Sequence, residues 1–190
     1  MDLDYKKFRW FKTSSGKIVI GGKNEDQNEA IVKEFIGKNN IIIHTEEPGS
    51  PFCIIMNEKA SREDIEEASI FTASFSQQWK KKKSKAQVNI FSGKDVHKEK
   101  SMKTGTFGVN NSKRKNVELK LKIAVQDEKI RAIPLNAESE INLPEIILSP
   151  GMIPKAEVSK LIKQNLKNYN FSLEDIEQAI PSGGFNIRKI

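Results

Sequence analysis

The sequence predicts an α+β fold: a single domain with a mixed or antiparallel sheet, flanking helices and a C-terminal helical extension. Two observations lead to this prediction. Strand-like segments, alternating or continuously apolar, are interspersed with amphipathic segments of helical period, and their order shows no regular βαβ repeat. The chain has 190 residues, of which 37% are hydrophobic and 30% charged, so it can bury a sizeable core and lacks a disordered composition.

The first part of the chain predicts a β-hairpin followed by a helix. Residues 8–13 and 17–20 are strand-like and are separated by the turn sequence Ser14-Ser15-Gly16. A helix then begins at a polar cap near Asn24 and runs to about residue 36, where Gly37 is a typical stop.

Two apolar runs, 41–43 and 52–56, show no polar alternation and predict strands buried on both faces. The sequence from Ser61 to Asp64 resembles a capping box and predicts a helix that runs to about Trp79. Trp79 lies on the apolar stripe of this helix, which favours a core or boundary position over a base-stacking platform.

The middle of the chain predicts further strands. Residues 86–92 alternate, residues 93–104 form a polar loop, and residues 104–109 form a strand or tight turn. Residues 118–125 alternate strictly, which predicts a half-exposed strand of the main sheet with a basic outer face. A turn then leads into 129–135, which completes a hairpin.

The C-terminal part predicts an extended, proline-punctuated stretch over 134–150, then two helices. The first carries an apolar stripe that includes Leu161 and Leu166, and the second covers 172–180 behind a capping box at Ser172. We expect two units: a domain over 1–135, and an extension over 136–190 whose helices pack on that domain.

Basic charge is concentrated between residues 79 and 122. This segment has 14 Lys and Arg against three acids, whereas the rest of the chain has a slight acidic excess. Such a field attracts polyanions. A solvated Lys-rich face is the alternative, but the run lies between folded segments and is interleaved with strand and turn residues. The pattern therefore favours a nucleic-acid surface.

Other patterns exclude several classes of protein. The start of the chain does not resemble a signal peptide, and no stretch has the length of a membrane-spanning helix. The single cysteine, Cys53, lies in an apolar run and predicts a buried residue in a reducing compartment. We therefore expect a cytoplasmic protein without membrane contact. No metal or cofactor motif is present, and we predict neither a metal nor a cofactor.

Two histidines are the candidates for acid–base chemistry. His44 follows the apolar run 41–43, where it could serve as a base but is more typical of a turn-organising residue. His97 lies in a Lys-rich loop beside Asp95, where a phosphate contact is favoured. Since no nucleophile, paired carboxylates or metal-ligand spacing accompanies them, the sequence predicts no catalytic residue.

Several motifs, in order, resemble one family. They are the hairpin with Phe8-Arg9-Trp10-Phe11 and Gly21-Gly22-Lys23, then Asn28-Glu29, Ile43-His44-Thr45 with Pro48-Gly49-Ser50-Pro51, the helix ending at Trp79 before a Lys run, Thr104-Gly105-Thr106-Phe107, and Lys113-Arg114-Lys115. Over roughly residues 6–125 this set resembles the NFACT-R domain. The stretches 150–156 and 180–184 resemble the tail of its free-standing forms.

The resemblance implies an RNA-binding domain of ribosome-associated quality control. It implies tRNA or ribosomal RNA, and the ribosomal large subunit, as partners. The chain has no counterpart of the N-terminal NFACT domain, helix–hairpin–helix segment or coiled coil of the full-length proteins, so template-free tailing is not implied. The predicted RNA-binding residues are His44, Thr45, Ser50, Lys80, Lys81, Lys82, Lys83, Lys85, Lys98, Lys103, Thr104, Lys113, Arg114 and Lys115.

Two alternatives to simple RNA binding stay open. One is an RNA-modifying or RNA-processing enzyme, in which His44 works with Asp95 or His97 across a cleft. The other is a protein-interaction scaffold, for which an apolar patch on the C-terminal helices would be evidence. Oligomeric state and the identity of the RNA do not follow from the sequence.

Overall fold

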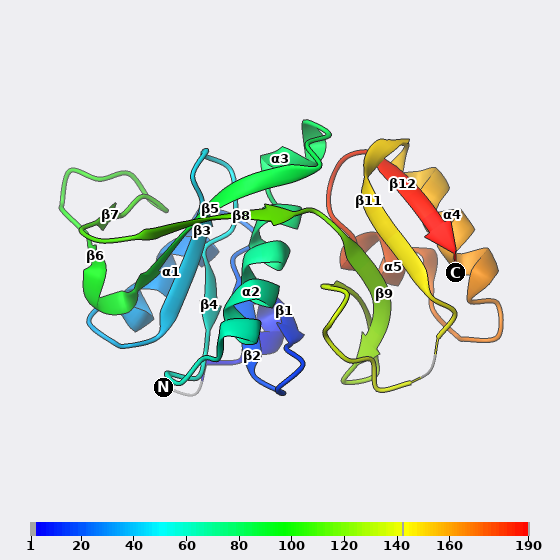
Figure 1. Cartoon of the computed structure of the whole chain (residues 1–190), viewed down its shortest axis with the longest axis horizontal. Coiled ribbons are helices and arrows are strands. Elements are labelled where there is room, and N and C mark those ends of the chain that lie inside the picture. The colour runs from blue at the N-terminus through cyan, green and yellow to red at the C-terminus, as the bar shows by residue number, and fades with distance from the viewer. Residues whose placement is uncertain (1–2, 142, 190) are drawn as a thin grey trace.

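The computed structural model describes residues 3–141 and 143–189, and it confirms the predicted α+β class. Two layered halves lie side by side and share one hydrophobic core (Figure 1). After a short helix η1 (Tyr5–Lys7), the first half holds a six-stranded antiparallel sheet in the order β1-β2-β4-β3-β5-β8. Its strands are β1 (Arg9–Lys12), β2 (Ile18–Gly21), β3 (Ile41–Thr45), β4 (Cys53–Ile55), β5 (Lys85–Ser92) and β8 (Lys113–Glu118).

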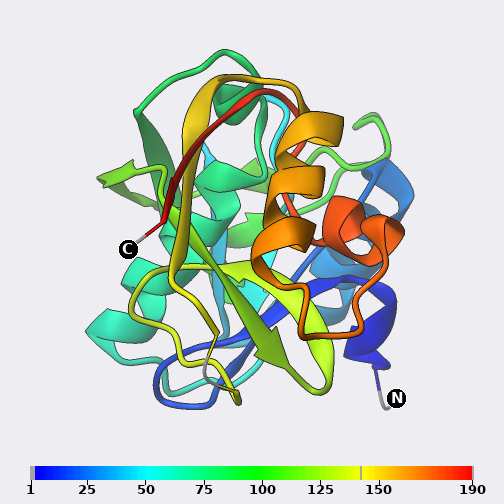
Figure 2. The ribbon, with the colours of Figure 1, turned by 90° about the vertical axis from the view of Figure 1, so that its right-hand side faces the viewer.

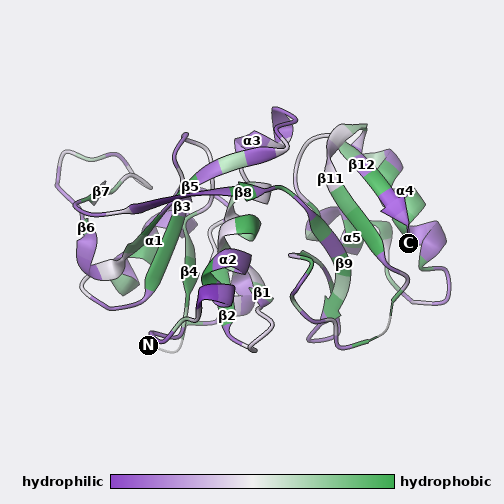
Figure 3. Ribbon diagram, viewed as in Figure 1, coloured by the Kyte–Doolittle hydropathy of each residue, from purple (hydrophilic) through white to green (hydrophobic). Residues whose placement is uncertain are grey.

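Helices cover both faces of this sheet because apolar residues alternate between its two sides. Helix α1 (Glu25–Phe35) packs on the side that holds Trp10 and Ile42, and helix α2 (Arg62–Ser74) packs on the side that holds Phe11 and Ile43. The predicted hairpin, the Asn24 cap and the buried strands β3 and β4 are confirmed, and β3 is apolar throughout its centre (Figure 3).

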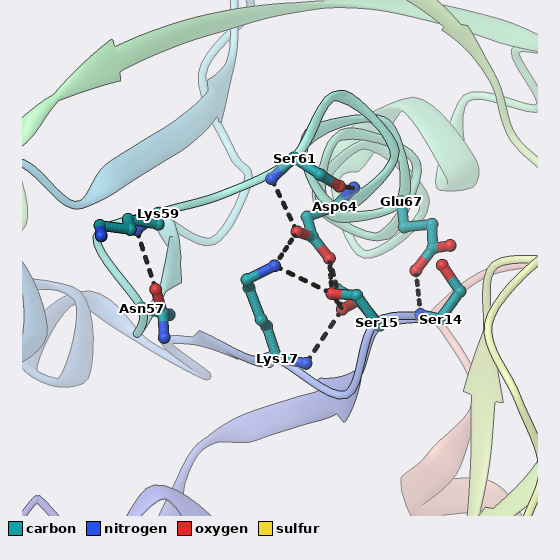
Figure 4. A network of polar contacts seen from close by, with 9 residues as sticks. Ser14, Ser15, Lys17, Asn57, Lys59, Ser61, Asp64 and Glu67 are labelled. Atoms are coloured by element: carbon teal, nitrogen blue, oxygen red, sulfur yellow. Dashed lines mark hydrogen bonds and ion pairs between the residues drawn. The ribbon is translucent and has the colours of Figure 1, made fainter.

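A buried carboxylate fastens the β1–β2 turn to the start of α2. Asp64 is fully buried and accepts hydrogen bonds from Lys17 Nζ at 2.6 Å, Ser15 Oγ at 2.5 Å and the backbone N–H of Ser61 at 2.8 Å (Figure 4). Burial by itself raises the pKa of Asp64, but these bonds and one from Thr13 together hold that pKa well below its usual range. The capping box at Ser61 is thereby confirmed.

The helix predicted to run through to Trp79 is broken. Helix α2 ends at Ser74, and a separate short helix α3 (Gln77–Lys80) follows. Ser76 adopts an extended conformation and accepts from Gln78 N–H, while Gln77 N–H donates to the carbonyl of Gly49. These bonds start a new helix in a new direction. Trp79 is fully buried, so its predicted core position is confirmed.

The second half is a four-stranded sheet in the order β10-β9-β11-β12. Its strands are β9 (Leu121–Gln126), β10 (Lys129–Ile133), β11 (Ile146–Ile153) and β12 (Phe185–Lys189). Helix α4 (Lys155–Asn165) packs on β11 and β12, and helix α5 (Leu173–Ala179) packs on β10 (Figure 2). The β9–β10 hairpin and the capping box at Ser172 are as predicted.

The single half-exposed strand predicted over 118–125 is wrong. The chain leaves the first sheet after β8 and enters the second sheet with β9, and Leu119 at the junction is buried. All but one residue of β9 are buried. Its alternation does not mark one solvated face, because the core of both halves closes around the strand.

Strands β11 and β12 were not predicted, because Pro150 and Gly151 interrupt the pattern of β11 and β12 is a short strand of five residues. The predicted division at residue 135 stays a prediction, and strands from both sides of it share the second sheet. The polar loop predicted over 93–104 contains a short helix η2 (Gly93–Asp95) and strand β6 (Val96–His97), which pairs with β7 (Gly108–Val109). Among the described residues, no helix is long and apolar enough to cross a lipid bilayer.

Candidate functional site

The candidate site is a cleft of about 700 Å³ at one end of the six-stranded sheet. The start of α1, the 45–51 turn, α3 and the 104–107 turn surround it. We call it the His44 cleft. Of the predicted RNA-binding residues, five line it: His44, Thr45, Ser50, Lys80 and Thr104.

The floor of the His44 cleft belongs to a row of polar side chains that crosses three strands. His44 on β3 lies opposite Asn89 on β5, and Asn89 lies opposite Arg114 on β8. Residues that are directly opposite point to the same face of a sheet. On the same face, the next pair along these two strands is Ile42 and Phe91, and both pack in the core that α1 covers. The row therefore continues that face with polar groups, of which His44 and Asn89 line the cleft.

His44 is held in one orientation. Its Nδ1 lies 2.6 Å from the carbonyl oxygen of Thr45, and its ring packs on Phe52 with the centroids 4.3 Å apart. Burial lowers the pKa of His44, although the contact with the Thr45 carbonyl opposes this. The ring is therefore neutral near pH 7, with its proton on Nδ1, and Nε2 is left as an acceptor.

Thr45 and Ser50 shape the turn that forms one wall. Ser50 Oγ accepts from Thr45 N–H at 3.0 Å, and Thr45 Oγ1 donates to the Glu47 carbonyl at 2.6 Å. Both residues are buried. Gly49 has a φ of +95°, and a Cβ there would lie 2.4 Å from Gln77 Cγ. These two hydroxyls are thus committed to the wall rather than exposed to a ligand.

Glu29 anchors the opposite wall to α1. Its carboxylate accepts from Lys98 Nζ at 2.8 Å and from the backbone N–H of Gly105 at 2.8 Å, and it also pairs with Lys33. These partners lower the pKa of Glu29 to about 2, the Lys33 contact contributing most. The Lys98 ammonium donates also to the carbonyls of Lys103 and Thr106, so all three of its donors are used.

Phe107 closes this wall over Phe52 in an edge-to-face contact, with ring centroids 5.5 Å apart. The Lys98 ammonium lies over the Phe107 ring, 4.8 Å from its centroid. Lys98, predicted as an RNA contact, therefore serves to position the 98–107 segment.

The other predicted cations surround the cleft without lining it. Lys81 pairs with Glu47 at 2.7 Å, Arg114 with Glu46 at 3.1 Å, and Lys115 with Glu66 on α2. Lys82 contacts Met152 Sδ at 2.9 Å, and Lys85 lies 4.0 Å from Glu118. Lys83, Lys103 and Lys113 are exposed. Lys80 at the cleft is joined by two cations that the prediction missed, Arg9 and Lys23.

The structure does not bring together the groups of the enzymatic alternative. Neither Asp95 nor His97 is among the residues that line the His44 cleft. The Asp95 carboxylate accepts from Ser92 Oγ at 2.6 Å, which lowers the pKa of Asp95, and His97 lies 3.9 Å from Glu99. Burial raises the pKa of the Cys53 thiol to about 12. The described residues include no cluster of His, Cys, Asp and Glu able to hold a metal ion.

The described residues also lack the apolar patch on the C-terminal helices that the scaffold alternative requires. The exposed large apolar residues in the described part of the chain lie on separate elements, and among them only Leu173 belongs to a C-terminal helix.

Sequence reasoning missed Asn28, Phe52, Asn89 and Phe107 as cleft residues. Asn28 Oδ1 accepts from Phe52 N–H at 3.0 Å, whereas Asn89 Oδ1 is buried and has no partner among the described residues. One signal was present in the sequence. Along one face of the strand, the residues change from apolar Phe91 to polar Asn89 and Gln87. Only the pairing register shows that this change coincides with His44.

The fold and the cleft define a basic α+β module with a polar, cation-rimmed cleft, of the kind that binds nucleic acid. Residues 7–111 match the family model described as the NFACT protein RNA binding domain, and the chain belongs to that family.

Similar proteins agree with this assignment. The chain is 28% identical over 197 residues to the archaeal Rqc2 homolog aRqcH of Methanocaldococcus jannaschii, covering 97% of this chain and 29% of that protein. It is 38% identical over 53 residues to the ribosome quality control complex subunit NEMF of Homo sapiens, covering 28% of this chain and 5% of that protein. The chain thus spans under a third of the length of either relative.

A solved structure shares the fold. The C-terminal part of the fibronectin/fibrinogen-binding protein from Streptococcus suis superposes with a TM-score of 0.53 at 26% identity, over 58% of this chain and 45% of that one.

Proposed function

We propose that this protein binds RNA in ribosome quality control, and that unpaired nucleotides of tRNA or ribosomal RNA occupy the His44 cleft. The observation that carries the proposal is the row His44–Asn89 beneath a rim that includes Lys80. The family and the ribosome quality control proteins that resemble the chain support it.

The chemistry of the cleft suits single-stranded RNA. His44 Nε2 is an acceptor, able to receive a ribose 2′-OH or an exocyclic amine, and the Asn89 side chain lines the cleft opposite it. Phe107, half-buried at the cleft wall, presents an aromatic surface near them. Lys80 and the exposed Lys83 supply positive charge for phosphates.

The remaining predicted residues divide by role. Lys81, Lys82, Lys85, Lys103, Lys113, Arg114 and Lys115 extend the positive field around the cleft, while Thr45, Ser50 and Lys98 hold its walls. We propose a cytoplasmic site of action and the ribosomal large subunit as the particle on which the RNA is met, since the similar proteins are named for ribosome quality control.

A salt titration of tRNA binding tests the proposal. For single strands the logarithm of the binding constant falls by about 0.7 per phosphate contact for each unit of log salt. Replacing Lys80, Lys81, Lys82 and Lys83 by Ser should weaken binding to every RNA and make this slope shallower.

The matched control replaces three exposed lysines far from the cleft, Lys160, Lys163 and Lys167, by Ser. This variant should keep the slope of the unsubstituted protein. If the control set flattens the slope and the 80–83 set leaves it unchanged, the RNA lies on another face and the proposal is wrong.

A further inference from the structure

A second cleft, of about 960 Å³, lies between the two halves of the molecule. Strand β1, strand β10, helix α5 and the first residue of α4 contribute to its walls. We call it the Arg131 cleft. Its basic lining residues are Lys6, Arg9, Lys23, Lys129, Arg131 and Lys155.

Two half-buried guanidinium groups in this cleft have no partner. Neither Arg9 nor Arg131 takes part in any side-chain hydrogen bond or ion pair within residues 3–141 and 143–189. Arg131 lies over the ring of Trp10, 3.9 Å from its centroid, and Arg9 lies 5.0 Å from the centroid of Phe75. Aromatic faces hold both cations in place but satisfy none of their N–H donors.

Two buried donors in the same place are also unsatisfied. Trp10 Nε1 and Arg131 Nε have no acceptor in the part of the chain that the structure describes. A buried donor without a partner is costly, and such groups usually have one in a folded protein. Here both unsatisfied atoms are donors, and the basic side chains of the lining outnumber the acidic ones, which is the pattern expected around a missing anion.

The cations also repel one another. Burial, and then the charges of Arg9 and Arg131, lower the pKa of Lys23. Burial, and then Arg9, lower the pKa of Lys155, whose ammonium donates to the Ile180 carbonyl at 3.1 Å. Burial lowers the pKa of Arg131 to about 10.

Acidic residues line the cleft as well, but two of them are engaged elsewhere. The Asp175 carboxylate caps α5 through Ser172, and Glu174 accepts from Gln178. Glu128 and Glu177 form no ion pair with the cleft cations, although Glu177 lies close enough to favour the charged form of Lys155. Asp127 favours the charged form of Arg131 from a distance, but no acid among the described residues forms an ion pair with Arg9 or Arg131.

The two clefts adjoin, because Arg9, Lys23, Phe75 and Ser182 line both. We propose that the Arg131 cleft binds a backbone phosphate of the same RNA strand that occupies the His44 cleft, with the guanidinium groups of Arg9 and Arg131 as its ligands. This assignment rests on the proposed function. A phosphate oxygen is the acceptor that planar guanidinium donors fit best, and it supplies the missing negative charge.

The site joins two parts of the chain. Arg9 belongs to the matched family region, whereas Arg131 and Lys155 lie beyond residue 111. The C-terminal half therefore contributes directly to RNA binding in this proposal.

The first test asks whether the cleft binds phosphate at all. Thermal unfolding of the full chain is measured in inorganic phosphate and in chloride at matched ionic strength, for the unsubstituted protein, Arg131→Gln and the control Lys163→Gln on α4. Phosphate should raise the Tm of the unsubstituted protein and of the control, and this rise should be absent in Arg131→Gln. A rise that persists in Arg131→Gln, or no rise in any protein, overturns the proposal.

Removal of a repelled cation should leave the fold intact. Lys155→Gln is a second variant, which should reduce the phosphate-dependent rise even if Arg131→Gln proves unstable. A Lys155→Gln protein with the full rise, together with an unfolded Arg131→Gln protein, counts against the site.

The second test asks whether the phosphate belongs to RNA. Binding of oligoadenylates of increasing length is compared for the same proteins. Arg131→Gln should leave the shortest RNAs unaffected and weaken the longer ones about tenfold, with a salt slope shallower by about 0.7.

The two tests distinguish a failure of the phosphate assignment from a failure of the proposed function. If RNA binds normally to Arg131→Gln at every length, this assignment fails while the proposed function stands. If phosphate stabilises the protein but no RNA binds, the proposed function fails, and with it the assignment of the phosphate to RNA.

Discussion

Trp79 donates its indole N–H to the carbonyl oxygen of Gly184 at 3.0 Å, across 105 positions of the chain. The same ring packs on Phe185, with the centroids 5.4 Å apart. Trp79 lies in α3, directly before the Lys run, and Gly184 directly precedes β12. One side chain thus joins the basic edge of the first half to the second sheet, within the shared core.

Replacing Trp79 by Phe should destabilise the protein by about 2–3 kcal/mol, because it removes this hydrogen bond and leaves a void beside Phe185. Trp10→Phe is a matched control, since Trp10 is equally buried but its N–H has no partner. Urea unfolding should show the smaller loss for Trp10→Phe. Equal losses would mean that the bond to Gly184 contributes nothing measurable.

Replacing Asn89 by Ala should weaken RNA binding about tenfold, or about 1.4 kcal/mol, with little effect on stability. The side chain makes no hydrogen bond within the described residues, so its loss leaves no protein group unsatisfied. Filter binding and thermal unfolding measure the two effects. Asn168→Ala, at an exposed position shortly after α4, is the control and should bind normally. Unchanged binding by Asn89→Ala would remove this residue from the site.

Replacing Glu29 by Gln should loosen the 98–107 segment. The pKa of Glu29 is lowered, so its contribution to stability is complete above its usual value of 4.5 and is lost as the pH falls towards about 2. Hydrogen exchange of the Gly105 amide, which donates to this carboxylate, should be faster in the variant at pH 7.

The matched control for this prediction is Glu34→Gln, because Glu34 pairs with Lys38 on an exposed surface. It should leave exchange at Gly105 unchanged. An equally slow exchange at Gly105 in Glu29→Gln would show that Lys98 and the backbone hold the segment without the carboxylate.

Replacing Asp64 by Asn should cost about 3–5 kcal/mol, because the Lys17 ammonium loses its buried counter-charge and the hydroxyls of Thr13 and Ser15 lose an anionic acceptor. The neighbouring exposed Glu63→Gln is the control and should be nearly neutral. The free energy of unfolding in urea compares them. A loss under about 1 kcal/mol for Asp64→Asn would show that the network is not a main tie between the hairpin and α2.

The sequence by itself determined the elements whose signals are local. Alternating and continuous apolar runs predicted β1 to β5, and polar caps such as Asn24, Ser61 and Ser172 predicted helix starts, because strand faces and cap hydrogen bonds depend on residues a few positions apart. The ordered motifs also pointed to the family to which the chain belongs.

Tertiary structure decided what depends on distant partners. Helix α2 ends before Trp79, where the Gln77 N–H donates to the carbonyl of Gly49. The alternating stretch 118–125 is divided between two sheets. Lys98 donates to Glu29, and Asn89 lies opposite His44 on the neighbouring strand. The register of paired strands, and the presence of Arg9 and Arg131 in one cleft, depend on residues far apart in the chain, so no local pattern encodes them.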